Sequence, residues 1–457
     1  MAITINEQLE ELLKITYRDG VSDLLGRNSP LLREIQRGRV EGREVRFSAI
    51  YSRGGAYGGN FNKVKERASN SAKAVEFKVT PGNVFATYAV STKEILASRN
   101  REGAYMPIAQ ANMFASSEGF RKTLALCAYG RGYGEICKAR ATSVTAGTPF
   151  TMTLNESALM ALDIESIVDV KASVDASTVK GSFTIQKIVG SAITAVSETS
   201  FEILDTDILC LSLAMDPLGN KLLPVGFGGW LPTIGKRTGA DWEGYIASDF
   251  FGVNRSLNPE RLAGAFVDGT ASGVTVRSAV EDLLRKVRRN GSEADLIVMN
   301  DKTFAELAKQ IDTTNTYFTM TSTKERRKAS IGLSEASASF STNFIENIYD
   351  DPYCPEGVIY VLDKKSTWLW SLSNVDTIDD GVVANNPGLP NPLNASDTGN
   401  QPNQLLIDNF LTIETGKGDI NGPTVDVTLN CYGAFAVQNP AVAGVAVMDS
   451  DYIGLVK

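Results

Sequence analysis

Residues 51 to 61 restrict the fold of this chain more than any other segment, because four of these eleven residues are glycine. Glycine at that density disfavours a helix and permits sharp bends. A run of alternating polar and apolar residues follows, Ala74 to Val79, and after Pro81-Gly82 comes a second run, Val84 to Val90. We expect these runs to pair as an antiparallel ribbon with a flexible, basic tip. An isolated ribbon is marginally stable in water, so this one is expected to rest on another copy of the chain.

The chain before the ribbon is predicted to form an arm. A short helix is expected from Asn6 to Tyr17, where leucines recur at helical spacing. After Ser29-Pro30, apolar residues stand among arginines, and Val45, Phe47 and Ala49 alternate as in a strand. This mixture of apolar and basic residues favours an arm that crosses a neighbouring subunit.

Two helices are predicted after the ribbon. Ser91 and Glu94 have the spacing of a capping box, which marks the start of the first helix. The second begins near Pro107, a residue suited to a first helical turn, and ends at Gly130. An apolar stripe runs along this second helix, whose length we estimate at roughly 35 Å from a rise of about 1.5 Å per residue.

Residues 137 to 216 are predicted to form a compact, inserted β module. Val, Ile, Thr, Ser and Ala dominate this segment, Trp and Tyr are absent, and turn residues recur between short alternating runs. The module has five basic and ten acidic residues, so it is not expected to attract nucleic acid electrostatically.

The following part of the chain is predicted to form an α/β lobe with the order helix, strand, helix, strand. The first helix covers Val276 to Val287, and the strands cover Asp295 to Met299 and Val358 to Leu362. Residues 385 to 403, rich in proline and asparagine, are expected to form an exposed loop. Thr424 to Val437 alternates again and is predicted to be a closing strand.

Composition argues against catalysis. The sequence has no histidine, the side chain best suited to proton transfer near neutral pH and the commonest metal ligand. Its five cysteines lack CxxC spacing, which disfavours a tetrahedral metal site and a disulfide framework. The glycines of residues 130 to 134 follow a helix, whereas a dinucleotide loop must follow a strand. The carboxylate pairs Asp205/Asp207 and Asp379-Asp380 are interpreted as surface turns. We therefore predict no catalytic, cofactor-binding or metal-binding residues.

Charge is unevenly distributed along the chain, whose net charge is −8. Between Arg27 and Arg67 ten basic residues accompany four acids, whereas Ser366 to Gly416 holds six acids and no Lys or Arg. Opposite patches on one chain suit contacts between identical neighbours, although two solvated faces that never meet explain them equally well. No run approaches the roughly 18 apolar residues of a membrane span, so no membrane partner is expected.

Residues 250 to 264, FFGVNRSLNPERLAG, are entered through Gly228 to Pro232 and combine a turn with a helix start. This segment resembles one that recurs in major capsid proteins of tailed bacteriophages. The Gly54 to Phe61 run ahead of the ribbon and Ala128-Tyr129-Gly130 at the end of the long helix support the likeness, which covers nearly the whole chain. Periodicity alone indicates only a multi-lobed α/β protein. The resemblance implies an α+β, HK97-like capsid fold with an inserted small all-β domain.

The parts of that fold can be assigned to segments of this chain. They are the N-terminal arm (1–49), the E-loop ribbon (50–91), the spine helix with part of the peripheral domain (92–136), the inserted β domain (137–216), the continuation of the peripheral domain (217–272), the axial domain (273–423) and a closing strand of the peripheral or axial domain (424–457).

The resemblance implies a structural protein that assembles as pentamers and hexamers into an icosahedral shell around double-stranded DNA. The expected partners are other copies of the chain, the packaged DNA, a portal, a separate scaffold protein and possible decoration proteins. The expected location is the virion capsid, after assembly in the bacterial host cytoplasm. Two alternatives stay open: an encapsulin-like compartment that encloses cargo proteins, and a metabolic enzyme with an accessory β domain.

Basic residues of the arm and the ribbon are the predicted contacts to neighbouring subunits or to DNA. They are Arg33, Arg37, Arg39, Arg43, Arg53, Lys63, Lys65 and Arg67. Some members of the resembled family join the ribbon of one subunit to an asparagine of another through a lysine. Lys63 and Lys65 are candidates for that link, and ordinary solvated lysines are the alternative.

Overall fold

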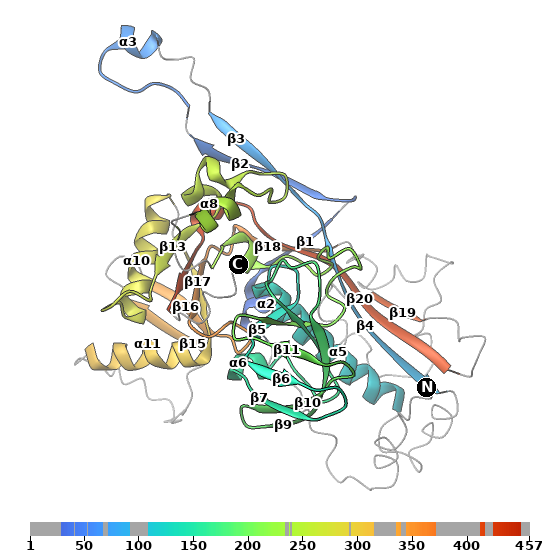
Figure 1. The fold of residues 1–457 in the computed structure, drawn as a ribbon. Helices are drawn as coiled ribbons and strands as arrows, with labels where there is room; N and C mark the ends of the chain where they lie inside the picture. The colour runs from blue at the N-terminus through green and yellow to red at the C-terminus, as the bar shows by residue number, and fades with distance from the viewer. Residues whose placement is uncertain are drawn as a thin grey trace, which may run out of the picture. The chain divides into compact units, whose positions relative to one another are not determined.

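The computed structural model describes residues 29–40, 42–52, 54–66, 72–91, 108–233, 237, 240–291, 294–314, 335–339, 344–371, 412–415 and 424–448 (Figure 1). The described residues fall into two compact units. The first unit draws on Asn83–Leu124 and Ser371–Gly433, and the second on Ser29–Gly82, Ala125–Trp370 and Ala434–Lys457. The predicted helix from Asn6, the helix after Ser91 and the loop 385–403 lie outside the described residues.

A two-stranded ribbon belongs to the second unit. β2 (Val45–Ser52) pairs antiparallel with β3 (Lys73–Val79), from Val45 opposite Val79 to Ser52 opposite Lys73. The short helix α3 (Phe61–Glu66) lies at the outer end of the ribbon (Figure 1). The chain therefore leaves along β2 and returns along β3, with the glycine-rich segment between them.

The strand partner predicted for Ala74 to Val79 is wrong. β4 (Gly82–Ser91) pairs with β20 (Thr424–Val437), not with β3. After Pro81 the chain continues into β4 instead of reversing, and Gly82 lies at this point. A Cβ at Gly82 would lie 2.4 Å from the backbone nitrogen of Pro224, so the chain is held tightly against that backbone where a hairpin turn was expected.

A mixed sheet forms the α/β core of the second unit. Its strand order is β13-β21-β17-β14-β16-β15. The bounds are β13 (Ala265–Asp268), β14 (Leu296–Met299), β15 (Glu335–Ser339), β16 (Phe344–Asp350), β17 (Val358–Leu362) and β21 (Gly444–Val447). β14 and β17 are buried along their whole length. The predicted strands at 295–299 and 358–362 are confirmed, whereas β13 and β21 were not predicted.

Two helices accompany this sheet, α10 (Val276–Arg289) and α11 (Asp301–Thr314). The predicted helix from Val276 is confirmed. Thr275 caps it: its side chain accepts a hydrogen bond from the Ser278 backbone, and Ser278 reaches back to the Thr275 backbone. The buried side of α10 packs into the same hydrophobic core as β14 and β17.

Residues 135 to 211 form a second, antiparallel sheet with its own hydrophobic core. Its strand order is β5-β12-β8-β9-β10-β7, and β6 pairs with β11 beside it. The bounds are β5 (Glu135–Lys138), β6 (Thr142–Val144), β7 (Phe150–Thr153), β8 (Ile167–Lys171), β9 (Gly181–Val189), β10 (Ala192–Val196), β11 (Phe201–Ile203) and β12 (Ile208–Leu211); the short helix α6 (Glu156–Leu159) follows β7. The strand-rich character predicted from composition is confirmed.

The long helix α5 (Ile108–Tyr129) matches the predicted second helix. Its residues up to Leu124 belong to the first unit and its last turn belongs to the second. In the first unit, β19 (Thr412–Thr415) pairs antiparallel with β20. In the second unit, the short helix α2 (Pro30–Glu34) leads into β1 (Gln36–Arg39), which pairs with β18 (Thr367–Ser371).

None of the helices described here has the length and apolar character needed to cross a membrane. Across the described ranges, no three His, Cys, Asp or Glu side chains gather closely enough to hold a metal ion. All five cysteines of the sequence lie in described segments, and all are buried free thiols.

Candidate functional site

Residues 250 to 264 begin with a tight turn that contacts the ribbon. Phe250 and Val253 exchange two backbone hydrogen bonds of 3.1 Å each. Between them, Phe251 has a φ of +53° and Gly252 a φ of +85°. The left-handed conformation is costly for a bulky residue such as Phe251. Its carbonyl oxygen accepts a hydrogen bond of 2.9 Å from the backbone N–H of Lys78 in β3, so the strained turn is fastened to the ribbon.

A short 3-10 helix, η1 (Arg255–Leu257), and the helix α9 (Pro259–Leu262) continue the segment. Asn254 caps the first and Asn258 caps the second, where Pro259 occupies a favourable first position. Asn258 also donates its Nδ2 to the carbonyl oxygen of Tyr51 in β2 at 3.1 Å, and Arg261 donates to the same oxygen at 3.2 Å. The segment therefore holds both strands of the ribbon.

An aromatic cluster fills the space between this segment and the base of the ribbon. Trp230 is completely buried at the end of α7 (Phe227–Trp230), and its Nε1 donates to the Phe435 carbonyl oxygen at 2.8 Å. Its ring centroid lies 5.8 Å from Phe47 of β2 and 5.2 Å from Phe77 of β3. The rings of Phe250 and Phe251 contact it as well, at 5.0 and 5.5 Å. Aromatic pairs at these distances stabilise beyond their buried area.

Two glycines bring α7 against the last turn of α5. A Cβ at Gly226 would lie 2.1 Å from the carbonyl oxygen of Cys127, and one at Gly228 would lie 2.3 Å from that of Tyr129. Contacts of this length are forbidden to any larger residue. These glycines therefore set the position of Trp230 and, through it, of the ribbon.

Arg255 is a buried cation beneath the turn, with an exposed fraction of 1%. It donates to the carbonyl oxygen of Gly229 at 2.9 Å, and its guanidinium lies 4.0 Å from the ring centroid of Phe250. The guanidinium also lies 5.2 Å from the ring centroid of Tyr245 in α8 (Ala240–Ala247). Burial raises the pKa of Tyr245, but the charges of Arg131 and Arg255 outweigh burial and lower it below its ordinary value.

The outer part of the ribbon contrasts with its base. Phe77 and Val79 at the base are completely buried, whereas Ile50 is 65% exposed, Tyr57 81% and Phe61 76%. No residue of α3 is buried. Large apolar side chains are thus carried away from the core by a ribbon that is held firmly at the other end.

The start of the described chain is fixed by a buried carboxylate. The Ser29 hydroxyl and the Tyr129 hydroxyl, the latter at 2.8 Å, both donate to Oδ2 of Asp351, and the Tyr353 backbone donates to its Oδ1. A second, partly exposed contact holds the same region: the Lys364 ammonium group donates a hydrogen bond to the Glu34 carboxylate at 2.5 Å. Segments far apart in sequence, before the ribbon, at the end of α5 and after β16, meet at Asp351.

Comparison with solved structures identifies the fold. A chain of the cyanophage A-1(L) capsid asymmetric unit superposes with a TM-score of 0.53 at 10% sequence identity, over 96% of this chain and 98% of that chain. This chain shares its fold with a phage capsid subunit. A Mycobacterium phage Bobi chain (TM-score 0.44, 9% identity, 97% and 98% covered) and the capsid chain of a native GTA particle (0.44, 10%, 98% and 100%) are similar at lower scores. No family model matches the sequence, and no curated protein matches it.

The described members of the basic set that was predicted to make contacts lie on several different elements. Arg33 ends α2, pairs with Glu34 and lies 5.5 Å from the Tyr349 ring, while Arg37 in β1 donates to the Leu32 carbonyl oxygen. Lys63 and Lys65 are exposed on α3 at the ribbon tip, and Arg43 is exposed before β2. Arg53, Arg67 and the side chain of Arg39 lie outside the described parts of the structure.

The residues that attach the ribbon were only partly found from sequence. The segment 250 to 264 was singled out, but the burial of Arg255 and the contacts of Asn258 and Arg261 with Tyr51 were not predicted. Trp230, preceded by two glycines, was the available signal: a large aromatic residue after small ones indicates a tightly packed site. Asp351 had no local signal, because its side-chain partners Tyr129 and Ser29 are 222 and 322 residues away.

Proposed function

We propose that the chain is the major capsid protein of a tailed phage. It acts as a structural subunit with no catalytic role, and it assembles as pentamers and hexamers into an icosahedral shell around double-stranded DNA. The observation that carries this proposal is the β2–β3 ribbon, whose two strands are held by residues 250 to 264 and whose tip presents Tyr57 and Phe61 to solvent. The fold shared with the cyanophage capsid chain supports it.

The exposed ribbon tip supports self-assembly on energetic grounds. Burying apolar area stabilises by about 25 cal/mol per Å², so covering one large side chain contributes about 1.5–3 kcal/mol. In an isolated chain this contribution is lost at Tyr57 and Phe61. A neighbouring copy recovers it, and a closed shell repeats the contact in every subunit.

We assign the parts of an HK97-like subunit as follows. The β2–β3 ribbon serves as the E-loop, α5 as the spine helix, and the mixed sheet with α10 and α11 as the core of the axial domain. The antiparallel sheet of residues 135 to 211 is the inserted domain, and its ten acidic against five basic residues between 137 and 216 favour the outer surface. Portal, separate scaffold, decoration protein and packaged DNA are the proposed partners, with assembly in the host cytoplasm and a final place in the virion.

Electron microscopy of the expressed chain, alone and with its neighbouring gene products, tests this function. The expected result is closed icosahedral shells with pentamers and hexamers. Nucleic acid extracted from particles made during infection is expected to be double-stranded DNA. A stable, discrete monomer at high concentration would contradict the shell, and particles that contain protein cargo but no genome would contradict the phage assignment.

Neutralising the arm arginines tests the proposed contacts to neighbours and DNA. In the triple variant Arg33→Gln, Arg37→Gln, Arg39→Gln we expect lower shell yield and loss of genome from particles, because favourable charge contacts are removed. Particle yield by sedimentation and DNA content per particle are the measurements. Unchanged yield and unchanged DNA content together would exclude a contact role for these arginines.

A further inference from the structure

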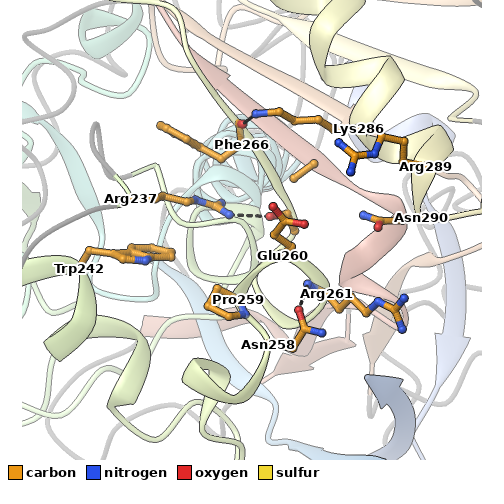
Figure 2. A pocket seen from close by; sticks show the side chains of 12 residues that line it. Arg237, Trp242, Asn258, Pro259, Glu260, Arg261, Phe266, Lys286, Arg289 and Asn290 are labelled. Carbon is orange, nitrogen blue, oxygen red and sulfur yellow. Dashed lines mark hydrogen bonds between the residues drawn. The ribbon is translucent and has the colours of Figure 1, made fainter. Parts of the chain in front are cut away.

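A basic cavity of about 660 Å³ lies beside the segment that holds the ribbon (Figure 2). It is bounded by α9, by the start of β13 and by the last turn of α10, all in the second unit. Four cationic side chains line it against one carboxylate, that of Glu260. The cations are Arg237, Arg261, Lys286 and Arg289.

The hydrogen bonds of three of these cations orient them without neutralising them. Arg237 donates to the carbonyl oxygens of Gly264 and Ala263, at 2.5 and 3.1 Å. Arg261 donates to Tyr51 and Lys286 to Phe266, again to carbonyl oxygens. Because a carbonyl carries no net charge, the cavity keeps an excess of positive charge.

Arg237 is held rigidly at the wall of the cavity. Its guanidinium lies between the rings of Trp242 and Phe266, 5.0 and 4.8 Å from their centroids. Its Nε is shielded from solvent and has no hydrogen-bond partner among the described residues. Burial, and then the charge of Arg255, lower the pKa of Arg237, and the charges of Tyr245 and Glu260 offset only part of this lowering. A carboxylate bound in the cavity would offset the excess positive charge of its lining.

The shape and charge of the site favour a protein carboxylate over DNA. A concave cavity accepts a side chain on a loop, whereas a DNA duplex presents its phosphates along a wide rod. A second copy of the chain is itself acidic, with a net charge of −8, and its residues from Ser366 to Gly416 include six acids and no Lys or Arg. Within that stretch, residues 373 to 382 carry Asp376, Asp379 and Asp380.

We propose that this cavity binds aspartate side chains from the acidic stretch of a second copy of the chain. This inference rests on the proposed self-assembly and names one contact through which it occurs. This contact joins the cavity of one subunit, which lies next to residues 250 to 264, to the acidic stretch of its neighbour. The ribbon and the acidic stretch therefore dock side by side.

Binding of a labelled peptide with the sequence of residues 373 to 382 to the unassembled, full-length chain tests the proposal by fluorescence anisotropy. We expect the aspartate peptide to bind at least about tenfold more tightly than the same peptide with three asparagines, since desolvated charge pairs contribute at this scale. The double variant Lys286→Glu, Arg289→Glu is expected to lose that preference.

The matched control is Arg285→Glu, Lys302→Glu, which makes the same change in net charge at exposed positions of α10 and α11 outside the cavity. It is expected to bind the peptide like the wild type. Equal binding of the two peptides, or equal loss in both variants, would overturn the site. So would a short DNA duplex whose binding is lost in the cavity variant while peptide binding is kept. If the chain forms shells but does not bind the peptide, the cavity contact alone is refuted. If the chain binds the peptide but forms no shells, the proposed function is refuted.

Discussion

At the scale of single residues, Arg255 is a buried cation stabilised by a carbonyl group and aromatic rings. Removing a buried charge from water is costly, and here no carboxylate within hydrogen-bonding distance offsets that cost among the described residues. The guanidinium supplies a hydrogen-bond donor to the Gly229 carbonyl oxygen and contacts the rings of Phe250 and Tyr245.

We expect Arg255→Met to destabilise the chain by about 2 kcal/mol, because the Gly229 carbonyl loses its partner and the ring contacts lose their cation. Denaturant unfolding followed by tryptophan fluorescence measures this, since all four tryptophans lie in the second unit. Arg285→Met is the control: its side chain is 62% exposed, and a change within about 0.5 kcal/mol is expected. Equal stability of both variants would contradict a structural role for Arg255.

Asp351 and Glu34 fix the same part of the chain but respond to pH in opposite directions. Burial raises the pKa of Asp351 above 3.8, although hydrogen bonds from Ser29, Tyr353 and Tyr129 oppose the rise. Burial also raises the pKa of Glu34, but the hydrogen bonds and charges of Lys364 and Arg33 outweigh it and bring the pKa below 4.5.

The contributions of Asp351 and Glu34 to the free energy of unfolding are therefore expected to change with pH in opposite directions. A carboxyl with a raised folded pKa contributes most below its unfolded pKa, so the stability of wild type relative to Asp351→Asn is expected to fall as the pH rises from about 3.8 through the folded pKa. The stability of wild type relative to Glu34→Gln is expected to fall as the pH decreases below 4.5. If both differences in the free energy of unfolding changed with pH in the same direction, the environment described for Asp351 or for Glu34 would be wrong.

At the scale of elements, the contact of α7 with the end of α5 positions the aromatic cluster. Gly226→Ala places a methyl group against two backbone carbonyls, at 2.1 and 2.3 Å. The backbone must move, and we expect a loss of about 1–3 kcal/mol in the free energy of unfolding.

Gly244→Ala in α8 provides the matched control for that substitution, because a Cβ there meets nothing within 4 Å. Replacing glycine by alanine inside an open helix is expected to stabilise by up to about 1 kcal/mol. The same tryptophan-monitored unfolding compares the two variants. A neutral Gly226→Ala would mean that α7 and α5 do not require this close approach.

Elements with a strong local pattern could be predicted from sequence, and strand partners could not. α5, α10, β17 and β20 follow from periodicity and end signals within their own residues. The partner of β3 does not, because no signal within residues 45–49 or 84–90 decides which of these two runs pairs with it. Packing of Phe47 and Phe77 on Trp230, more than 150 residues further along the chain, decides between them.

At the scale of the whole molecule, the same limit applies to the site. The segment 250 to 264 was recognisable from its sequence, but its contacts depend on β2, β3 and α7 arriving at one place. The predicted basic residues share a sign of charge, and those that the structure describes lie on separate elements, among them α2, β1 and α3. Charge counts along a sequence report composition, whereas a site requires proximity that only the fold provides.

The ribbon tip offers the clearest test at this scale. We expect Tyr57→Ser with Phe61→Ser to leave the stability of the unassembled chain unchanged within about 0.5 kcal/mol, because both side chains are exposed. The threshold concentration for shell formation, followed by light scattering, is expected to rise by roughly tenfold or more as buried contact area is lost.

The control for the ribbon tip is Ile164→Ser with Val189→Ser. Ile164 is 61% exposed and Val189 is 59% exposed, and both lie within the antiparallel sheet region of residues 135 to 211. The control variant therefore removes exposed apolar surface away from the ribbon tip. It is expected to assemble like the wild type. Equal impairment of both double variants would point to a general effect of surface composition.

The burial of every cysteine has a practical consequence for labelling. Burial raises the pKa of the Cys137 thiol to about 12 and that of Cys431 to about 11, so little reactive thiolate is present at neutral pH. A maleimide dye would therefore react very little with the native cysteines. One cysteine introduced at an exposed position of the ribbon would then carry a single fluorophore per subunit, without first removing any native thiol.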